Sequence, residues 1–483
     1  MSSGLPQTAT RRAHPAPAGW PAERPGERPP SHADGEIARA REALAALLGP
    51  PGTRAFDVRL WDGTVEPAAG GGAAPFTFVV RRPGALRRAF LPPSELAMAE
   101  AYLRDDLDIE GDLVAGSLLA DALARRLASP ASLARAVRAL LALPGDDAGP
   151  GDHSSPRDDA TRRWRGWRTT GRLHTRSRDA DAVRFHYDVG DDFYALWLDA
   201  RMQYSCAYFA REDATLDAAQ EAKLEHICRK LRLRPGDRLL DIGCGWGGLL
   251  EYAATRHGIE GVGITLSARQ AEGARARLAR AGLAARCRIE VRDYRTLAGE
   301  AAFDRIVSVG MREHVGRRRL PEYFATAQRL LRPGGLFLDH GILRGGSAAP
   351  RGIARRLAAW VRHRAWRRDA FIQRYVFPDG DVMPLGVLLG AAEAAGLEAR
   401  DVENLREHYA RTLREWVARL ERRHDEAARL VGERTYRVWR LYMAATVHGF
   451  ASGRLTLVQT LFAKPHPGGR VELPATRADV YGG

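Results

Sequence analysis

The sequence contains little lysine, little cysteine and no long apolar run. Lysine occurs only at Lys223, Lys230 and Lys464, although lysine and arginine together number 74 of the 483 residues. The four cysteines show neither metal-ligand spacing nor a disulfide framework, which fits a reducing cytoplasm. No run of about 18 apolar residues occurs, and the N-terminus lacks the apolar segment of a signal peptide. These absences argue against a transmembrane or disulfide-stapled protein and predict a soluble or peripheral one.

What remains is a basic chain of ordinary apolar content. Its net charge is +15 at pH 7. A positive surface predicts an anionic partner, either nucleic acid or a phospholipid face. The length exceeds that of one ordinary core, so we expect a large domain accompanied by a smaller one.

Composition and periodicity divide the first part of the chain. Residues 1–34 are rich in proline and poor in apolar side chains, which predicts a disordered tail. Residues 35–143 begin with a helical period from Glu36 to Leu48 and continue with strand-like segments at Phe56–Thr64 and Phe76–Arg82. Because helical text follows, this part predicts a small α+β domain.

The second part begins with a linker and continues as alternating strands and helices. Residues 144–180 are predicted to be a basic linker, with seven arginines and two tryptophans between Arg162 and Arg178. This segment fits either a solvated linker or an arm on anionic lipid headgroups, where tryptophan favours the interface. Residues 181–483 alternate between strand-like and helical text, which predicts a doubly wound, mostly parallel sheet of the α/β class.

A glycine-rich turn, "LLDIGCGWGG" at Leu239–Gly248, follows the first of these strands. The strand ends in Asp241, and the glycines let the backbone approach a ligand at the carboxyl end of the strand. A dinucleotide site would need G-x-G-x-x-G and an acid about 20 residues later, but the second strand ends in "GITLSARQ" without a carboxylate. The D-x-G-x-G form is typical of S-adenosylmethionine methyltransferases. S-adenosylmethionine is therefore the expected cofactor, with NAD and a purely structural turn as the alternatives.

Further motifs occur in order around this turn, and together they carry a resemblance. They are "FHYDVGDDFYALWLD" (Phe185–Asp199), "MQYSCAYF" (Met202–Phe209), "AQEAKL" (Ala219–Leu224), "GITLSARQ" (Gly263–Gln270), "RDYR" (Arg292–Arg295), "FDRIVSVG" (Phe303–Gly310) and "HYARTLREW" (His408–Trp416). The set resembles the cyclopropane-fatty-acyl-phospholipid synthases and the related mycolic acid methyltransferases. The resemblance implies a Rossmann-like class I methyltransferase domain, and the N-terminal domain is similar to the lipid-associated helper domain of the bacterial phospholipid enzymes.

The resemblance also implies a reaction. Members of the family transfer the methyl group of S-adenosylmethionine to a cis double bond of an unsaturated phospholipid acyl chain. Because an alkene is a poor nucleophile, positioning must supply much of the rate. Methyl addition leaves a carbocation, and in the family a bound bicarbonate removes the proton that allows a cyclopropane ring to close.

Site residues follow from the same resemblance, position by position. The expected cofactor-binding residues are Tyr204, Ser205, Asp241, Gly243, Cys244, Gly245, Trp246, Gly247, Thr265, Gln270, Asp293 and Tyr294. For Thr265 the alternative is a strand-end hydroxyl that caps the next helix. No metal site is expected.

The bicarbonate cage of the family falls on Cys206, Glu313, His340 and Tyr409. A protonated histidine and a tyrosine hydroxyl can donate to a carbonate oxygen, while a glutamate accepts from its hydroxyl. Taken singly, His340 would be a core histidine and Tyr409 a helix-surface aromatic. His314, beside Glu313, is interpreted as structural.

Three positions depart from the family pattern. Arg312 stands where an aromatic or aliphatic residue is usual, and a charge in an acyl pocket costs several kcal/mol unless it is paired; a side chain that points outward would be harmless. Thr446 replaces a cysteine that many members carry. The segment Arg351–Arg368 has the pattern of a basic amphipathic helix, which suits a membrane surface or an ordinary helix packed on its own domain.

The favoured function is cyclopropanation of phospholipid acyl chains by a cytoplasmic enzyme, peripheral at the inner face of the membrane and bound to anionic headgroups. Arg312 keeps open a methyl-branched or methylene product. A nucleic-acid methyltransferase is disfavoured because the Asn/Asp-Pro-Pro-aromatic signature is missing, and a non-catalytic lipid binder because the cage residues are present. Since members of the family are often dimers, a homodimer is a further expectation.

Overall fold

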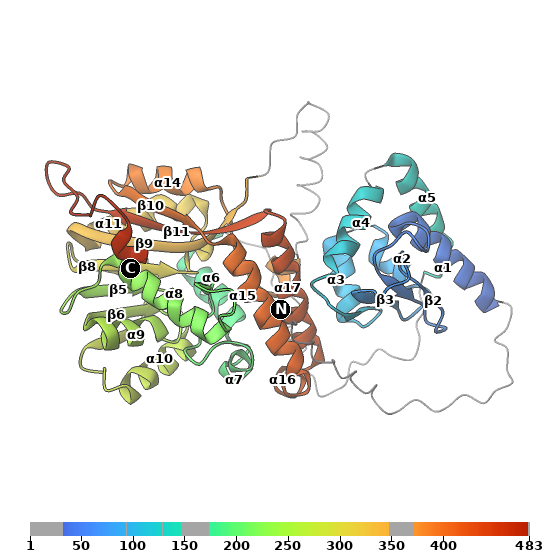
Figure 1. Ribbon diagram of the computed structural model, residues 1–483, viewed down its shortest axis with the longest axis horizontal. Helices are drawn as coiled ribbons and strands as arrows, with labels where there is room; N and C mark the ends of the chain where they lie inside the picture. The colour runs from blue at the N-terminus through green and yellow to red at the C-terminus, as the bar shows by residue number, and fades with distance from the viewer. Residues whose placement is uncertain (1–31, 93, 128, 146–172, 347–370, 482–483) are drawn as a thin grey trace, which may run out of the picture.

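The computed structural model describes residues 32–92, 94–127, 129–145, 173–346 and 371–481. It contains a small N-terminal domain beside a larger α/β domain (Figure 1). The expected tail lies outside the described residues except at its end, where α1 (His32–Leu48) begins. Most of the arginine-tryptophan segment and all of Arg351–Arg368 also lie outside them.

A seven-stranded sheet in the order β10-β11-β9-β8-β5-β6-β7 forms the centre of the larger domain. Strands β5 to β9 run parallel, whereas β11 pairs antiparallel with both β9 and β10. The strands are β5 (Arg238–Ile242), β6 (Glu260–Thr265), β7 (Cys287–Val291), β8 (Phe303–Val309), β9 (Leu331–Arg344), β10 (Glu398–Asn404) and β11 (Leu455–Ala463). The predicted doubly wound α/β fold is confirmed, while the antiparallel pair β10 and β11 was not predicted.

Helices cover both faces of this sheet (Figure 1). Helices α8 (Leu216–Leu231), α9 (Gly248–His257) and α10 (Ala268–Arg280) bury their apolar faces in one core. Helices α11 (Leu320–Leu330) and α14 (Leu385–Ala394) bury theirs in the other. Both faces of the parallel strands are therefore shielded from solvent, which explains their nearly continuous apolar sequences.

A third core lies beyond the edge of the sheet and is rich in aromatic side chains. Its helices are α6 (Arg176–Tyr187), α7 (Asp191–Ala195), α13 (Phe371–Tyr375), α15 (Arg406–Arg422), α16 (His424–Val431) and α17 (Glu433–Ala451). Trp197 packs against Trp416 and Trp439 with ring centroids 5.4 and 5.6 Å apart. Helix α6 already covers the last residues of the segment that was expected to be a linker.

The N-terminal domain is built on a four-stranded sheet in the order β2-β1-β3-β4. Its strands are β1 (Asp57–Arg59), β2 (Val65–Glu66), β3 (Phe76–Val80) and β4 (Leu107–Gly111). The other helices are α2 (Ala85–Phe90), α3 (Glu95–Leu103), α4 (Ser117–Leu127) and α5 (Pro130–Leu141). The sequence after Arg82 was expected to be helical, and β4 corrects this, because pairing with β3 outweighs weak local strand propensity.

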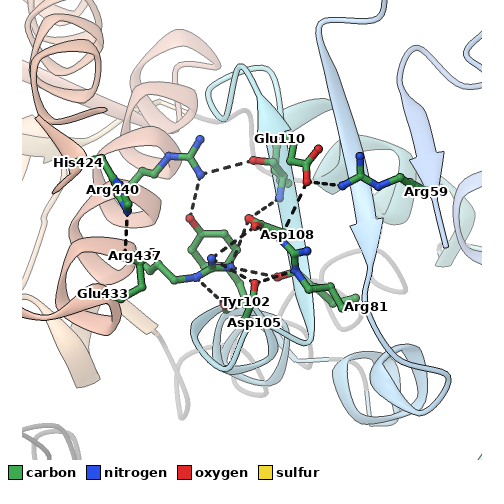
Figure 2. Close-up of polar contacts among 12 residues, drawn as sticks. Arg59, Arg81, Tyr102, Asp105, Asp108, Glu110, His424, Glu433, Arg437 and Arg440 are labelled. Carbon is green, nitrogen blue, oxygen red and sulfur yellow. Dashed lines mark hydrogen bonds and ion pairs between the residues drawn. The ribbon is translucent and has the colours of Figure 1, made fainter. Parts of the chain in front are cut away.

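Helix α17 joins the two domains (Figure 2). The Arg437 side chain is buried, and its Nε and Nη2 donate to the carbonyls of Tyr102 and Leu107 at 2.9 and 3.2 Å. Its guanidinium lies 4.0 Å from the centroid of the Tyr102 ring and pairs with Asp108 at 3.3 Å. One turn further, Arg440 donates to the Tyr102 hydroxyl at 3.0 Å. These desolvated contacts fix the N-terminal domain on the aromatic core of the larger one.

We predict that Arg437→Met loosens this docking. The substitution leaves the two carbonyls and Asp108 without their buried donor, so hydrogen exchange in α3 and β4 should accelerate by at least about tenfold. Exchange is followed by mass spectrometry. Arg434→Met, at an exposed position of the same helix, is the control, and equal exchange in the two variants would contradict the prediction.

Candidate active site

A cavity of about 1100 Å³, open to solvent, lies at the carboxyl ends of β5, β6 and β8. Eleven of the twelve residues expected to bind the cofactor line it: Tyr204, Ser205, Asp241, Gly243, Cys244, Gly245, Trp246, Thr265, Gln270, Asp293 and Tyr294. The missing one is Gly247. The topology explains this gathering, because the ends of adjacent parallel strands meet at one edge of a sheet.

The glycine turn has the backbone geometry that its sequence predicts. Gly243, Gly245 and Gly247 have φ of 89°, 52° and 77°, in the left-handed region that favours glycine. A Cβ at Gly243 would lie 2.8 Å from the Met311 side chain, and one at Gly247 3.0 Å from the Cβ of Ala274. Gly247 therefore allows α9 to approach α10, while the two earlier glycines form the cavity wall.

Thr265 and Gln270 are paired with each other at the end of β6. The Thr265 hydroxyl donates to Oε1 of Gln270 at 2.9 Å, and both side chains are buried. Ser267, not Thr265, caps α10 by accepting from the Gln270 amide at 3.2 Å. The capping alternative for Thr265 is therefore wrong. At the end of β7, the Tyr294 hydroxyl is buried without a hydrogen-bond partner among the described residues.

Ionisable groups that were not expected to bind the cofactor also reach this cavity. Lys223 of α8 lines it, as does His314. Burial raises the pKa of Asp241 to about 7, although Lys223 lowers it. The signal for Lys223 was present in the sequence, since it is one of three lysines in an arginine-rich chain and belongs to the "AQEAKL" motif.

None of the four expected cage residues lines the cavity; they lie deeper in the protein. Glu313 is in the short helix η3 (Arg312–His314) after β8, and its Oε1 accepts from the backbone amide of Ile342 at 2.6 Å. His340, in β9, is placed opposite the end of β8, where the Gly310 amide donates to its carbonyl at 2.8 Å. Within the described ranges, Oε2 of Glu313 and Nε2 of His340 are buried without a partner.

Tyr409 and Cys206 share a buried environment with Glu313. Burial raises the pKa of Tyr409 well above its usual value, and Tyr442, Cys206 and Glu313 add to the effect. Burial likewise raises the pKa of the Cys206 thiol, whose Sγ donates to the carbonyl of Ala207 at 3.2 Å. Both groups therefore stay protonated near neutral pH, and Cys206 is not an activated nucleophile.

Comparison with known proteins identifies the family. The model of the family described as mycolic acid cyclopropane synthetase matches residues 174–460. The chain belongs to this family. A probable fatty acid methyltransferase of Pseudomonas putida is 38% identical over 426 residues, covering 88% of this chain and 95% of the relative. The cyclopropane-fatty-acyl-phospholipid synthase of Escherichia coli K12 is 37% identical over 292 residues, covering 60% of this chain and 70% of the relative.

Solved structures of the family agree with the fold. The cyclopropane synthase MmaA2 from Mycobacterium tuberculosis is 32% identical and has a TM-score of 0.54. The match covers 61% of this chain and 100% of that chain. The mycolic acid cyclopropane synthase CmaA1, complexed with SAH and CTAB, is 33% identical and has a TM-score of 0.53. The match covers 59% of this chain and 97% of that chain. The protein is thus an S-adenosylmethionine-dependent methyltransferase of the cyclopropane synthetase family.

Against this family background, the protonation state of His340 needs a correction. We expected a protonated imidazole, but burial lowers the pKa of His340 well below its usual value, and Lys223, Lys230 and Arg312 lower it further. Its Nδ1 lies 3.2 Å from the side-chain amide nitrogen of Gln459. If that amide donates, the neutral ring carries its proton on Nε2, which remains a donor.

Arg312, the main departure from the family pattern, is neither in the cavity wall nor directed outward. Its side chain is fully buried, and Nε donates to Oδ2 of Asp339 at 2.8 Å. The Tyr323 hydroxyl donates to the other oxygen of Asp339 at 3.1 Å. A Cβ at residue Gly341 would lie 2.4 Å from Nη2 of Arg312, so the missing side chain of Gly341 makes room for the guanidinium. The charge is therefore paired, as its burial requires.

Two other residues take simple roles. The hydroxyl of Thr446 donates to the carbonyl of Tyr442 at 2.7 Å, one turn earlier in α17. His314, which was expected to be structural, contributes to the cavity wall, and burial lowers its pKa to about 4. His314 is therefore neutral at physiological pH.

We predict that Asp339→Leu destabilises the protein by about 3–5 kcal/mol, because it leaves the Arg312 guanidinium buried and unpaired. The double variant Arg312→Met/Asp339→Leu should lose only about 1–2 kcal/mol, chiefly from the stranded Tyr323 hydroxyl. Urea denaturation measures both free energies of unfolding. A double variant that is destabilised as much as Asp339→Leu, or more, would show that the buried pair is not a unit.

Proposed function

We propose that this enzyme transfers the methyl group of S-adenosylmethionine to the double bond of an unsaturated phospholipid acyl chain. The observation that carries the proposal is that two polar side-chain atoms, Oε2 of Glu313 and Nε2 of His340, are buried without a hydrogen-bond partner among the described residues. A buried polar atom without a partner needs an explanation, and a bound polar ligand is one.

The cavity at the glycine turn is the proposed cofactor site. When bound there, S-adenosylmethionine supplies an electrophilic methyl group on its sulfonium. Thr265 and Gln270, held together at the end of β6, fit the hydroxyls of a ribose, while Tyr294 offers an unpartnered hydroxyl. The backbone of Gly243 and Gly245 allows close approach to the ligand.

The proposed site for the acyl chain is the aromatic interior that adjoins the cavity. Tyr187 and Tyr204 line the cavity, and Tyr204 packs on Trp416 and Trp439 with centroids 5.3 and 6.1 Å apart. An apolar, aromatic environment suits a hydrocarbon, and ring faces favour a passing positive charge. The names of the relatives point the same way, since they are a fatty acid methyltransferase and an enzyme of fatty-acyl phospholipids.

Bicarbonate fits the cage residues. When bound, it would supply a base for the proton that leaves the methylated chain. Glu313 would accept a hydrogen bond through Oε2, and neutral His340 would donate through Nε2. The hydroxyl of Tyr409, kept protonated by burial, would be a second donor. These side chains would hold and orient the base, and the surrounding aromatic residues would exclude water.

For the product we propose a methyl-branched or methylene acyl chain. The relatives that cover most of this chain, from Pseudomonas putida and Mycobacterium tuberculosis, are described as probable fatty acid methyltransferases. A cyclopropane is the second candidate, favoured by the complete set of Cys206, Glu313, His340 and Tyr409.

In either case we propose a peripheral enzyme that binds anionic headgroups through its basic surface and acts as a homodimer, without a nucleic-acid partner. No helix among the described residues is long and apolar enough to cross a membrane.

The product is tested with purified enzyme, methyl-labelled S-adenosylmethionine and vesicles of monounsaturated phospholipid. We expect label in methyl-branched or methylene fatty acids, identified by mass spectrometry of their methyl esters. Label in a cyclopropane ring would establish the second candidate instead. Label in neither, with the cofactor bound, would overturn the proposed substrate.

The cage is tested by Glu313→Gln and His340→Ala. Each variant removes one of the unpartnered atoms, so kcat should fall by roughly 100-fold or more, while the affinity for S-adenosylhomocysteine changes little. Thr446→Ala is the control, because its hydroxyl bonds only within α17, and it should keep its turnover. Unchanged kcat in both cage variants would remove this assignment.

A further inference from the structure

The "AQEAKL" motif on α8 has no role in the reaction described so far. Its lysine, Lys223, is fully buried, yet it lines the cavity at the glycine turn. Nζ of Lys223 donates to Oε1 of Gln203 at 2.6 Å and to the Ser205 hydroxyl at 2.9 Å. Both partners are neutral.

The second lysine of α8, Lys230, is a buried ammonium whose charge is neutralised by carboxylates. Nζ of Lys230 pairs with Asp401 at 2.9 Å and with Glu403 at 2.6 Å. No carboxylate of the described residues forms such a pair with Lys223. Because a buried charge without a counter-charge is costly, the missing partner of Lys223 points to an anionic group supplied from outside the protein.

Holding the loop that carries Tyr204 and Ser205 does not require this charge. Nε2 of Gln220, one turn earlier in α8, donates to the carbonyls of Gln203 and Ser205 at 3.3 and 2.9 Å. Asp199 accepts from the backbone amide of Gln203 at 2.7 Å. A neutral lysine analogue could fill the same space, so the ammonium itself needs another explanation.

The ionisable groups near Lys223 indicate which charges the ligand carries. Burial lowers the pKa of Lys223 to about 8, although the carboxylates of Asp199 and Asp241 act to raise it. Asp199 is already engaged by the amides of Arg201 and Gln203. Asp241 lines the same cavity and lies close enough to Lys223 for the ammonium to lower its pKa. The cavity thus presents a cation and an acid near each other, which complements the zwitterion of an α-amino acid.

We propose that Lys223 binds the carboxylate of the amino-acid portion of S-adenosylmethionine and is its counter-ion in the protein interior. The proposal rests on the proposed cofactor site. It gives "AQEAKL" a function in which Gln220 holds the loop and Lys223 recognises the ligand. It also explains why a lysine stands here in a chain whose basic residues are nearly all arginine: a compact ammonium bonds to Gln203 and Ser205 as a point charge, whereas a guanidinium is a larger, planar group.

The test compares two ligands that differ in this carboxylate. S-adenosylhomocysteine carries the amino-acid group, whereas 5′-methylthioadenosine has the same nucleoside and thioether without it. In Lys223→Met, calorimetric affinity for S-adenosylhomocysteine should fall roughly 10- to 100-fold, the usual range for a lost charged hydrogen bond. Affinity for 5′-methylthioadenosine should stay within about twofold.

Arg229→Met is the matched control, because it removes one positive charge from an exposed position of the same helix and should change neither affinity. Lys223→Gln replaces the first variant if circular dichroism shows that Lys223→Met is unfolded. An equal loss for both ligands would mean that Lys223 only positions the loop, and no loss for either would also overturn the inference. Failure of the unaltered enzyme to bind S-adenosylhomocysteine would instead overturn the cofactor site itself.

Discussion

The arrangement behind the cavity depends on one buried carboxylate, that of Asp339. It sits in β9 next to His340, and it accepts from Arg312, which is next to Glu313. The ion pair therefore ties the short helix after β8 to the neighbouring strand and fixes the two proposed cage residues relative to each other. Tyr323 holds the second oxygen, so the carboxylate cannot turn without losing a partner. A charge that looked foreign to an acyl pocket is part of the scaffold.

Several ionisable groups around the site lack the charged partner that usually accompanies a buried charge. Lys223 pairs with no carboxylate of the described residues, and burial raises the pKa of Asp241 to about 7 and also raises the pKa of Glu313. Each of these states costs folding free energy, because desolvation opposes the charged form. Their concentration around the cavity supports the zwitterionic ligand and the bound base that we propose, because perturbed pKa values cluster at functional sites.

The sequence predicted the parallel part of the sheet well, because glycine turns and apolar strands are local signals. Nearly all the residues that it assigned to the cofactor line the cavity, since the motifs carry them, but it missed other lining residues such as Lys223. It did not predict β4, β10 or β11, whose pairing is set by distant strands rather than by their own composition. The partner of Arg312 and the neutral state of His340 could not be predicted from the sequence either, because both depend on burial and on side chains that are distant in the chain.

Gly341 gives the site an evolutionary constraint. A Cβ there would collide with Arg312, whereas an aromatic or aliphatic residue at position 312 would leave both the space above Gly341 and the Asp339 carboxylate unused. Positions 341 and 312 are therefore epistatic: a residue larger than glycine at 341 is compatible only with a side chain at 312 that leaves this space free.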